Sequence, residues 1–360
     1  MLSLLATTLL ALVPQTQDEL VLTDGKVLPV DKIVSETYTS VTFKRGSSEG
    51  KRPSEEVLEV RHSIGHKLLD DYAYGVELMQ ANNFTAAYSA FEEVLANDSL
   101  LDRKSYQWVK QHALWRQVRC QNSMAYFSGV SESADRLLTE VPDTFFYAPA
   151  LLMKAQARVD SGDKNGAKAV FEKLQADVDG LGLPERWRRE AELGLILLDD
   201  SMNASQKQME LQGLVEKNRD AYPTVASRAQ VEVGNAMVAG GDFKGARAFF
   251  EGIVEEGKGG DGILAAAISG LGDCAYLEAL SLDSPKEQTP FLEEAILNFL
   301  TVASVYREEV RLVPRAMYYA GDALKRIGDS GSARNVASRI RALYPDSTWK
   351  KRLFQELGLK

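Results

Sequence analysis

The segment GIVEEGKG, residues 252–259, is the nearest match to a nucleotide-binding motif, because it has the Gly-x-x-x-x-Gly-Lys spacing of a phosphate-binding loop. Such a loop follows a strand, opens a helix and continues with Ser or Thr, which coordinates magnesium. Here Gly259 takes that position, and Glu255 and Glu256 stand where phosphate would lie. We therefore reject nucleotide binding and predict no cofactor.

The histidines offer a second kind of chemistry, metal binding. His62 and His66 are four residues apart and Glu59 precedes His62 by three, so a helix would place all three on one face. They fall at a predicted junction between strands and helices, however, where histidine commonly caps or bridges. His112 has no obvious partner. We predict no metal site.

Catalytic signatures are missing from the sequence. It shows no Ser-His-Asp order, no paired carboxylates of a hydrolase and no Gly-x-Ser-x-Gly elbow, and three histidines supply little acid-base chemistry. We predict no catalytic residues and a protein that is not an enzyme.

Composition bounds the remaining possibilities. The 360 residues are 45% hydrophobic and 26% charged, which is typical of a globular chain with two domains or one solenoid. A net charge of −9 argues against nonspecific nucleic-acid binding. Residues 311–360 carry eleven Lys or Arg against four acids, a local +7, so residues 1–310 carry −16. The two cysteines, Cys120 and Cys274, fall in helices of different predicted units, and we interpret both as small core residues.

The N-terminus predicts export. Residues 2–13, LSLLATTLLALV, form an apolar run too short to span a bilayer but of signal-peptide length. We expect a signal peptide over 1–17, a periplasmic or cell-envelope location and no transmembrane segment in the mature chain; the alternative is a cytoplasmic protein with an N-terminal helix packed on its body. Export predicts a mature chain beginning between about Pro14 and Leu20. N-terminal sequencing of protein from the native host checks this, and an intact Met1 would contradict it.

Residues 18–62 predict a small antiparallel β module. Val, Thr and Tyr alternate with polar residues, and Asp24-Gly25, Gly46-Ser47-Ser48 and Pro53 break the pattern into four or five strands. Val41 and Phe43 would lie on one face of a strand and Thr42 on the other. The segment weakly resembles an SH3-like or Sm-like barrel.

Four later segments share one spacing. Gly234 is followed by Gly241 and Asp242 after seven and eight residues, by Ala246 after twelve and by Phe250 after sixteen. The same offsets start at Gly75, Ala155 and Gly321, with Ala337 in the aromatic position of the last copy. A Gly or Asn at offset seven can close one helix, and the next residue can cap another, so each copy predicts a helical hairpin. One hairpin cannot bury its apolar face alone, so the copies must stack.

These residues resemble the tetratricopeptide repeat, a helix-turn-helix unit with small residues at its eighth and twentieth positions and a large one at its twenty-fourth. Weaker units begin at Asn122, with Gly129 at its turn, at Gly194, whose second helix is shifted, and at Gly272, where an insertion precedes Ala295 and Phe299. The total is about seven repeats over residues 66–360. The insertion contains SLDSPKEQTP, residues 281–290, which we expect to be a loop.

The resemblance also predicts a binding groove. The position six residues before an anchor opens the first helix of a repeat and helps to line the concave surface. It is Arg at 116, 188, 228 and 315, and Arg near a helix N-terminus calls for anionic neighbours or an anionic ligand. Asn235 matches a clamp for a peptide carboxylate, although Val231 stands where the clamp lysine belongs. The predicted groove residues are Arg188, Arg228, Asn235, Arg315, Asp322 and Lys325.

The sequence thus predicts a mostly α protein, an α-solenoid of tetratricopeptide-like hairpins behind a small β module. We expect a noncatalytic scaffold that binds a protein or an extended acidic peptide. The end, ARNVASRIRALYPDSTWKKRLF, resembles the last repeat of bacterial envelope tetratricopeptide proteins. Two alternatives stay open: an enzyme or regulatory subunit with a substrate-binding β module, and nucleic-acid binding through the barrel. For the groove arginines the alternative is pairing with acids of the same chain.

Overall fold

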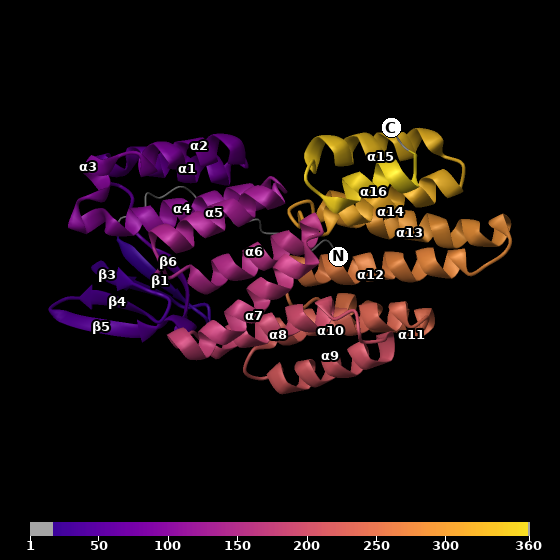
Figure 1. Ribbon diagram of the computed structural model, residues 1–360, viewed down its shortest axis with the longest axis horizontal. Coiled ribbons are helices and arrows are strands. Elements are labelled where there is room, and N and C mark those ends of the chain that lie inside the picture. The colour runs from indigo at the N-terminus through magenta and orange to yellow at the C-terminus, as the bar shows by residue number, and fades with distance from the viewer. Residues whose placement is uncertain (1–16, 359–360) are drawn as a thin grey trace, which may run out of the picture. The chain divides into compact units, whose positions relative to one another are not determined.

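The computed structural model describes residues 17–358, so the predicted signal peptide lies outside the described residues except for its last position. The chain forms two compact units, and Figure 1 labels the helices and strands of which they are built. Unit 1 is made by residues up to Gln117 together with Leu137–Tyr147, and unit 2 by Val118–Arg136 together with the chain from Ala148 onward. The division predicted from the sequence, 18–62 and 66–360, stays a prediction.

Unit 1 begins with antiparallel strands, as the alternation predicts. They form two three-stranded sheets, in the orders β2-β1-β6 and β3-β4-β5. Val41 and Phe43 are buried and Thr42, between them, is only half-buried. We expected four or five strands, but residues 17–358 contain six, because the chain passes from one sheet to the other at Asp31. The Asp31 carboxylate accepts a hydrogen bond from the Gly46 amide. The six strands are β1 Asp18–Leu22, β2 Val27–Val30, β3 Lys32–Glu36, β4 Ser40–Arg45, β5 Ser48–Pro53 and β6 Val57–Arg61.

From Lys67 onward the described elements are helices, and fourteen of them form seven consecutive hairpins, α1/α2 and then α4/α5 through α14/α15. The short helix α3 and the terminal helix α16 stand outside these pairs. The helices are α1 Asp70–Gln80, α2 Phe84–Leu95, α3 Asp98–Leu101, α4 Gln107–Ser123, α5 Phe127–Glu140, α6 Tyr147–Ser161, α7 Lys164–Leu181, α8 Glu185–Leu198, α9 Ala204–Asn218, α10 Pro223–Ala239, α11 Phe243–Glu256, α12 Asp261–Leu280, α13 Pro285–Val305, α14 Val313–Arg326, α15 Ser330–Leu343 and α16 Thr348–Glu356.

The turn of each strong repeat has the predicted chemistry. The residue seven after the anchor has a positive φ in all four copies: 57° at Asn82, 89° at Gly162, 84° at Gly241 and 90° at Gly328. Gly and Asn tolerate this backbone best, which is why those types recur there. The next residue caps the second helix, since its side chain accepts a hydrogen bond from an amide in the first turn; these caps are Asn83, Asp163, Asp242 and Asp329.

The small anchor and the aromatic residue pack against each other. A Cβ placed on Gly234 would lie 2.5 Å from the ring of Phe250, and one on Gly75 would lie 2.8 Å from the ring of Phe91. The same ring also reaches the next hairpin, because a Cβ on Gly270 would lie 2.3 Å from Phe250. Phe250 therefore fills the space between two hairpins, and both must present glycine to it.

Two details of the predicted register were wrong. In the unit anchored at Asn122, the turn residue is Ala125 with φ 52°, and Gly129 lies inside helix α5. The true anchor is four residues earlier, because an alanine adopts the left-handed backbone that the sequence pattern assigns to glycine. In the sixth unit the expected loop is short, because Pro285 takes the first position of α13 and the insertion lengthens the helix instead.

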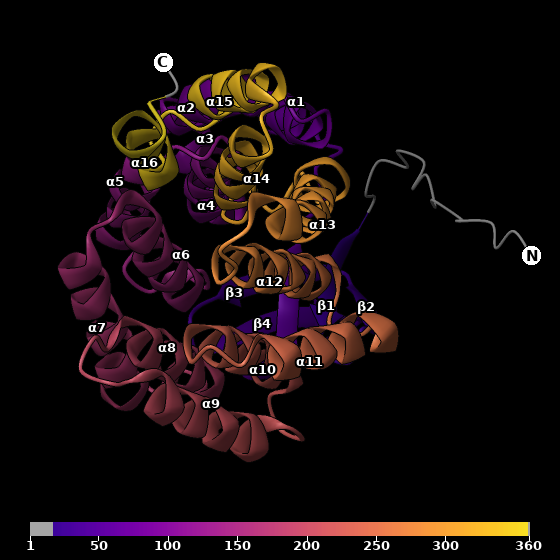
Figure 2. The same cartoon turned by 90° about the vertical axis from the view of Figure 1, so that its right-hand side faces the viewer.

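Unit 2 has the layered packing of a repeat stack. Successive helices from α7 to α16 contact one another in chain order, and the first helices of the hairpins, α8, α10, α12 and α14, also contact each other in turn (Figure 2). Early and late parts of this unit meet as well. Asp346 accepts a hydrogen bond from the Ser128 amide at the start of α5 (2.7 Å), and Arg311 pairs with Asp160 of α6. These contacts join segments far apart in sequence.

Helix α12 is the one helix of residues 17–358 that is both long and apolar enough to cross a membrane. Its most apolar stretch of 18 residues has a mean hydropathy of 1.4, but 61% of that stretch is buried inside the protein. Cys274 lies on it, and burial raises the pKa of its thiol to about 12. Cys120 is also buried, so both cysteines are core residues, as predicted.

Candidate functional site

The predicted groove residues lie on the first helices of hairpins in unit 2. Arg188 is on α8, Arg228 and Asn235 are on α10, and Arg315, Asp322 and Lys325 are on α14. The structure brings Asp322 and Lys325 together in one pocket, whereas the other four residues have separate partners.

Acidic neighbours surround the first three residues. Arg188 donates to Asp179 (2.6 Å) and to Glu185 (3.1 Å), and these hydrogen bonds raise its pKa. Arg228 pairs with Glu190, and Asn235 donates to Glu232. Intramolecular pairing, the alternative considered for these arginines, is thus present at both positions.

Arg315 ties two neighbouring first helices together. Its guanidinium donates to both carboxylate oxygens of Asp273 on α12 (2.7 and 2.8 Å) and to the Ser269 hydroxyl (3.0 Å). It also lies over the rings of Tyr319 and Trp349, at 5.0 and 5.9 Å from their centroids. Burial raises the pKa of Asp273, and the charge of Arg315 opposes that rise.

Near the Arg315–Asp273 pair, residues of α12, α14 and α16 line a pocket of ≈ 460 Å³. Two of the predicted groove residues, Asp322 and Lys325, line it. Its walls combine tyrosine rings with cationic side chains and a single carboxylate. The lining residues are Tyr276, Tyr318, Tyr319, Asp322, Lys325, Arg326, Arg352 and Leu357.

A hydrogen-bond network fixes the polar wall of the pocket. The Tyr276 hydroxyl donates to Asp322, which also accepts from Arg326 (2.7 Å). Burial, with Asp322 adding to it, raises the pKa of Tyr276 far above its usual range, so the phenol stays protonated. Lys325 donates to the Leu357 carbonyl (2.8 Å) near the end of α16. These cations hold further N–H donors, because an ammonium has three and a guanidinium five.

Sequence reasoning missed the aromatic part of the pocket. Arg352 stacks on Trp349 at 4.6 Å and on Tyr318 at 5.1 Å, and Tyr276 comes from the preceding repeat. The available signal was the basic C-terminal segment, which also contains Tyr318, Tyr319 and Trp349. Basic and aromatic residues close together in a sequence could have marked it.

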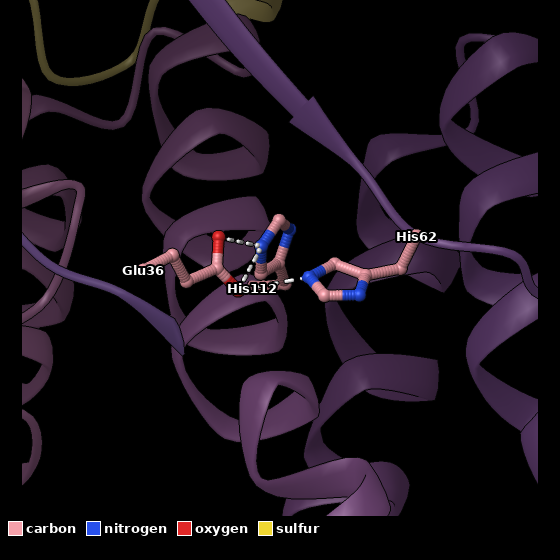
Figure 3. A group of neighbouring side chains, drawn as sticks. All are labelled: Glu36, His62 and His112. Atoms are coloured by element: carbon pink, nitrogen blue, oxygen red, sulfur yellow. Dashed lines mark hydrogen bonds and ion pairs between the residues drawn. The ribbon is translucent and has the colours of Figure 1, made fainter. Parts of the chain in front are cut away.

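A second polar cluster lies in unit 1 and was not expected. Glu36 at the end of β3, His62 just after β6 and His112 on α4 point toward one another (Figure 3). The Nε2 atom of His62 is 2.9 Å from Glu36 Oε1, and that of His112 is 3.0 Å from both Glu36 oxygens. Their side chains are 2 to 6% exposed. Burial alone would raise the pKa of Glu36, but the two imidazoles, His112 foremost, lower it to about 2.

This arrangement corrects the sequence interpretation of the histidines. His112 does have partners, which lie 76 and 50 residues away in the chain. Glu59, His62 and His66 do not share a helical face: Glu59 is on β6, where it pairs with Arg61, and His66 caps the turn at Lys67–Leu69. The GIVEEGKG segment ends helix α11, as expected, and Gly257 closes it with φ 61°.

The last hairpin matches a known family: residues 315–347, across α14 and α15, match the tetratricopeptide repeat. This hairpin is a tetratricopeptide repeat. The hairpins anchored at Gly75, Ala155 and Gly234 share the left-handed turn residue and the cap of this unit, so they are tetratricopeptide-like. No curated protein sequence matches the chain.

Several solved structures are similar at low identity. PilW, described as a widely conserved type IV pilus biogenesis factor, is 13% identical over 80% of this chain and 98% of its own, with a TM-score of 0.30. A Rap protein complexed with competence and sporulation factor is 13% identical over 81% and 98%, with a TM-score of 0.43. The tetratricopeptide domain of P58(IPK) is 12% identical over 82% and 89%, with a TM-score of 0.28. At these scores, the fold of this chain rests on its own repeats.

Proposed function

We propose that this protein is a noncatalytic protein-protein interaction scaffold whose C-terminal repeats bind an extended, acidic segment of a partner. The observation that carries the proposal is the pocket between α12, α14 and α16. It lies on first helices of the hairpins, the helices that line the groove of tetratricopeptide proteins, and it combines aromatic rings with an excess of cations.

Charge and ring chemistry favour an acidic peptide as the ligand. Lys325, Arg326 and Arg352 outnumber the single carboxylate Asp322, so the pocket attracts anions. Carboxylates bind guanidinium and ammonium groups through charge-assisted hydrogen bonds. The half-buried Tyr319 offers apolar ring surface to the peptide backbone and to apolar side chains. The site can therefore hold alternating acidic and apolar residues.

The noncatalytic part of the proposal rests on the groups in the pocket. A general base needs a pKa near neutrality, whereas Tyr276 has its pKa raised and Asp322 accepts two hydrogen bonds. Such a network holds side chains in place. We extend the proposal to export into the cell envelope on the basis of the N-terminal apolar run and the C-terminal resemblance.

A binding experiment tests the proposal. A fluorescein-labelled 12-residue peptide of alternating Glu and Leu is titrated with the protein, and its Gln counterpart serves as the uncharged probe. We expect the acidic peptide alone to bind, with affinity that falls as salt rises. Replacing both Lys325 and Arg352 with Ser should weaken binding roughly 10- to 100-fold, because two charged hydrogen-bond donors are lost.

The matched control is Arg334→Ser, which removes a cation from the exposed surface of α15, outside the pocket. It should bind as the wild type does. Equal affinity for the acidic and Gln peptides would overturn the electrostatic assignment. Equal loss in the control and the double variant would mean that overall charge, not this pocket, governs binding.

A further inference from the structure

We propose that Glu36, His62 and His112 form a binding site for a divalent transition-metal ion, best matched by Zn²⁺, inside unit 1. The site is separate from the pocket described above, and no part of the proposed peptide binding depends on it. It would join the ends of two strands to helix α4.

The first argument is convergence. The three side chains come from three elements, yet their ligand atoms all lie within 4.8 Å of one another. Both histidines present the same atom, Nε2, to the Glu36 carboxylate (Figure 3). Around a tetrahedral zinc ion with bonds of about 2.0 to 2.1 Å, neighbouring ligand atoms are about 3.3 Å apart. The observed separations of 2.9 and 3.0 Å need to widen by only a few tenths of an ångström.

The donor set selects the metal. Two imidazole nitrogens and a carboxylate suit zinc and its neighbours in the first transition row, whereas magnesium and calcium prefer all-oxygen sites. Because His112 Nε2 is equally far from both Glu36 oxygens, the carboxylate can offer one or two oxygen ligands. The structure thus supplies three or four ligand atoms.

The surroundings of His62 fit a metal ligand. Its Nε2 faces Glu36, while its Nδ1 is 3.8 Å from the Asp18 carboxylate. Asp18 is held in place by the amides of Ile33 and Ser63, at 2.8 and 2.7 Å. Metal-bound histidines commonly direct their second nitrogen to a carboxylate, which fixes the tautomer. The ring is also stacked on Trp108, with centroids 3.9 Å apart and planes 1° apart.

Charge balance points the same way. Asp18 and Glu36 place two carboxylates around two largely buried imidazoles. Uncompensated charge is costly in a buried site, so such groups are usually paired or bound to metal. A divalent cation would balance both carboxylates. In the metal-free protein each Nε2 donates its proton to the Glu36 carboxylate. On metal binding a neutral imidazole moves that proton to Nδ1 and gives its Nε2 lone pair to the metal, so no net proton is lost.

The test uses the full-length protein, stripped with a chelator and then titrated with Co²⁺ and Zn²⁺. We expect one Co²⁺ per chain with visible ligand-field absorption, its displacement by Zn²⁺ and a higher melting temperature with Zn²⁺. His112→Gln and Glu36→Gln should each weaken Zn²⁺ binding roughly 100-fold or more, and Asp18→Asn about 10- to 100-fold, as a positioning residue would.

The control is His66→Asn, which removes the one histidine outside the cluster while keeping an oxygen for the cap of the Lys67–Leu69 turn. It should bind Zn²⁺ as the wild type does. Absence of the cobalt absorption in the wild type would overturn the proposal without any variant. So would unchanged Zn²⁺ affinity in His112→Gln or Glu36→Gln, or a loss in His66→Asn equal to theirs.

Discussion

Phe250→Ala should lower the free energy of unfolding by about 3 to 5 kcal/mol, the largest effect that we expect from a single substitution in the repeats. The ring is fully buried and lies against glycines of two hairpins, Gly234 and Gly270, so its loss leaves a cavity that neither backbone can fill. Denaturant unfolding followed by circular dichroism measures the change. Phe249→Ala, one residue earlier and only half-buried, is the matched control and should cost less.

A double-mutant cycle makes the test specific to this contact. In the wild type, Gly234→Ala should destabilise the protein, because its methyl group would lie 2.5 Å from Phe250. Overpacking of this kind costs about 1 to 3 kcal/mol, and the higher helix propensity of alanine offsets part of that cost. In the Phe250→Ala background the same methyl group enters the vacated space and should be neutral or stabilising. Additive effects would contradict the packing of ring against glycine.

The strong repeats could be predicted because their determinants are local. The left-handed backbone at Gly241 and the cap at Asp242 depend on neighbouring residues, so type and spacing alone identify them. The partner of the small anchor is also only sixteen residues away, within the same hairpin. A repeated local pattern is therefore enough to predict the hairpins.

Where the local signal is ambiguous, the prediction failed. Gly129 looked like a turn residue, but Ala125 adopts the left-handed backbone and Gly129 lies in a helix. In the sixth unit, prolines at 285 and 290 suggested a loop, yet one opens helix α13 and the other lies inside it. Packing of the hairpin outweighs local preference at Ala125, whereas Pro285 occupies a position that proline favours at the start of a helix.

The polar sites were harder to predict because their members are distant in sequence. Glu36 and His112 are 76 residues apart and belong to a strand and a helix, so no spacing relates them. The pocket likewise joins Tyr276 to Arg352 across two repeats. The arginines were found by their place in the repeat, but their acidic partners, such as Asp273 for Arg315, depend on the packing of neighbouring hairpins.

Asp273→Ala should be the second most destabilising change, with a loss on the order of 2 to 4 kcal/mol. It removes the carboxylate that accepts two of the three hydrogen bonds donated by Arg315 and leaves a guanidinium whose side chain is only 29% exposed. The expected loss lies below that for a fully buried pair because Ser269 and the nearby rings still contact the arginine. Denaturant unfolding at neutral pH measures it.

The double variant Asp273→Leu with Arg315→Leu separates pairing from packing. Replacing both charges with apolar side chains should cost much less than Asp273→Ala, because no charge is left buried without a partner. The single variant Arg315→Leu adds a pH test. Burial raises the pKa of Asp273 in the folded state, and the loss of Arg315 raises this pKa further. A carboxyl with a raised folded pKa stabilises the protein below its unfolded pKa. That stabilisation is lost as pH rises through the folded pKa. Arg315→Leu should therefore lie closer to the wild type in stability at pH 5 than at pH 7.5; an equal difference at both would show that the arginine acts through packing alone.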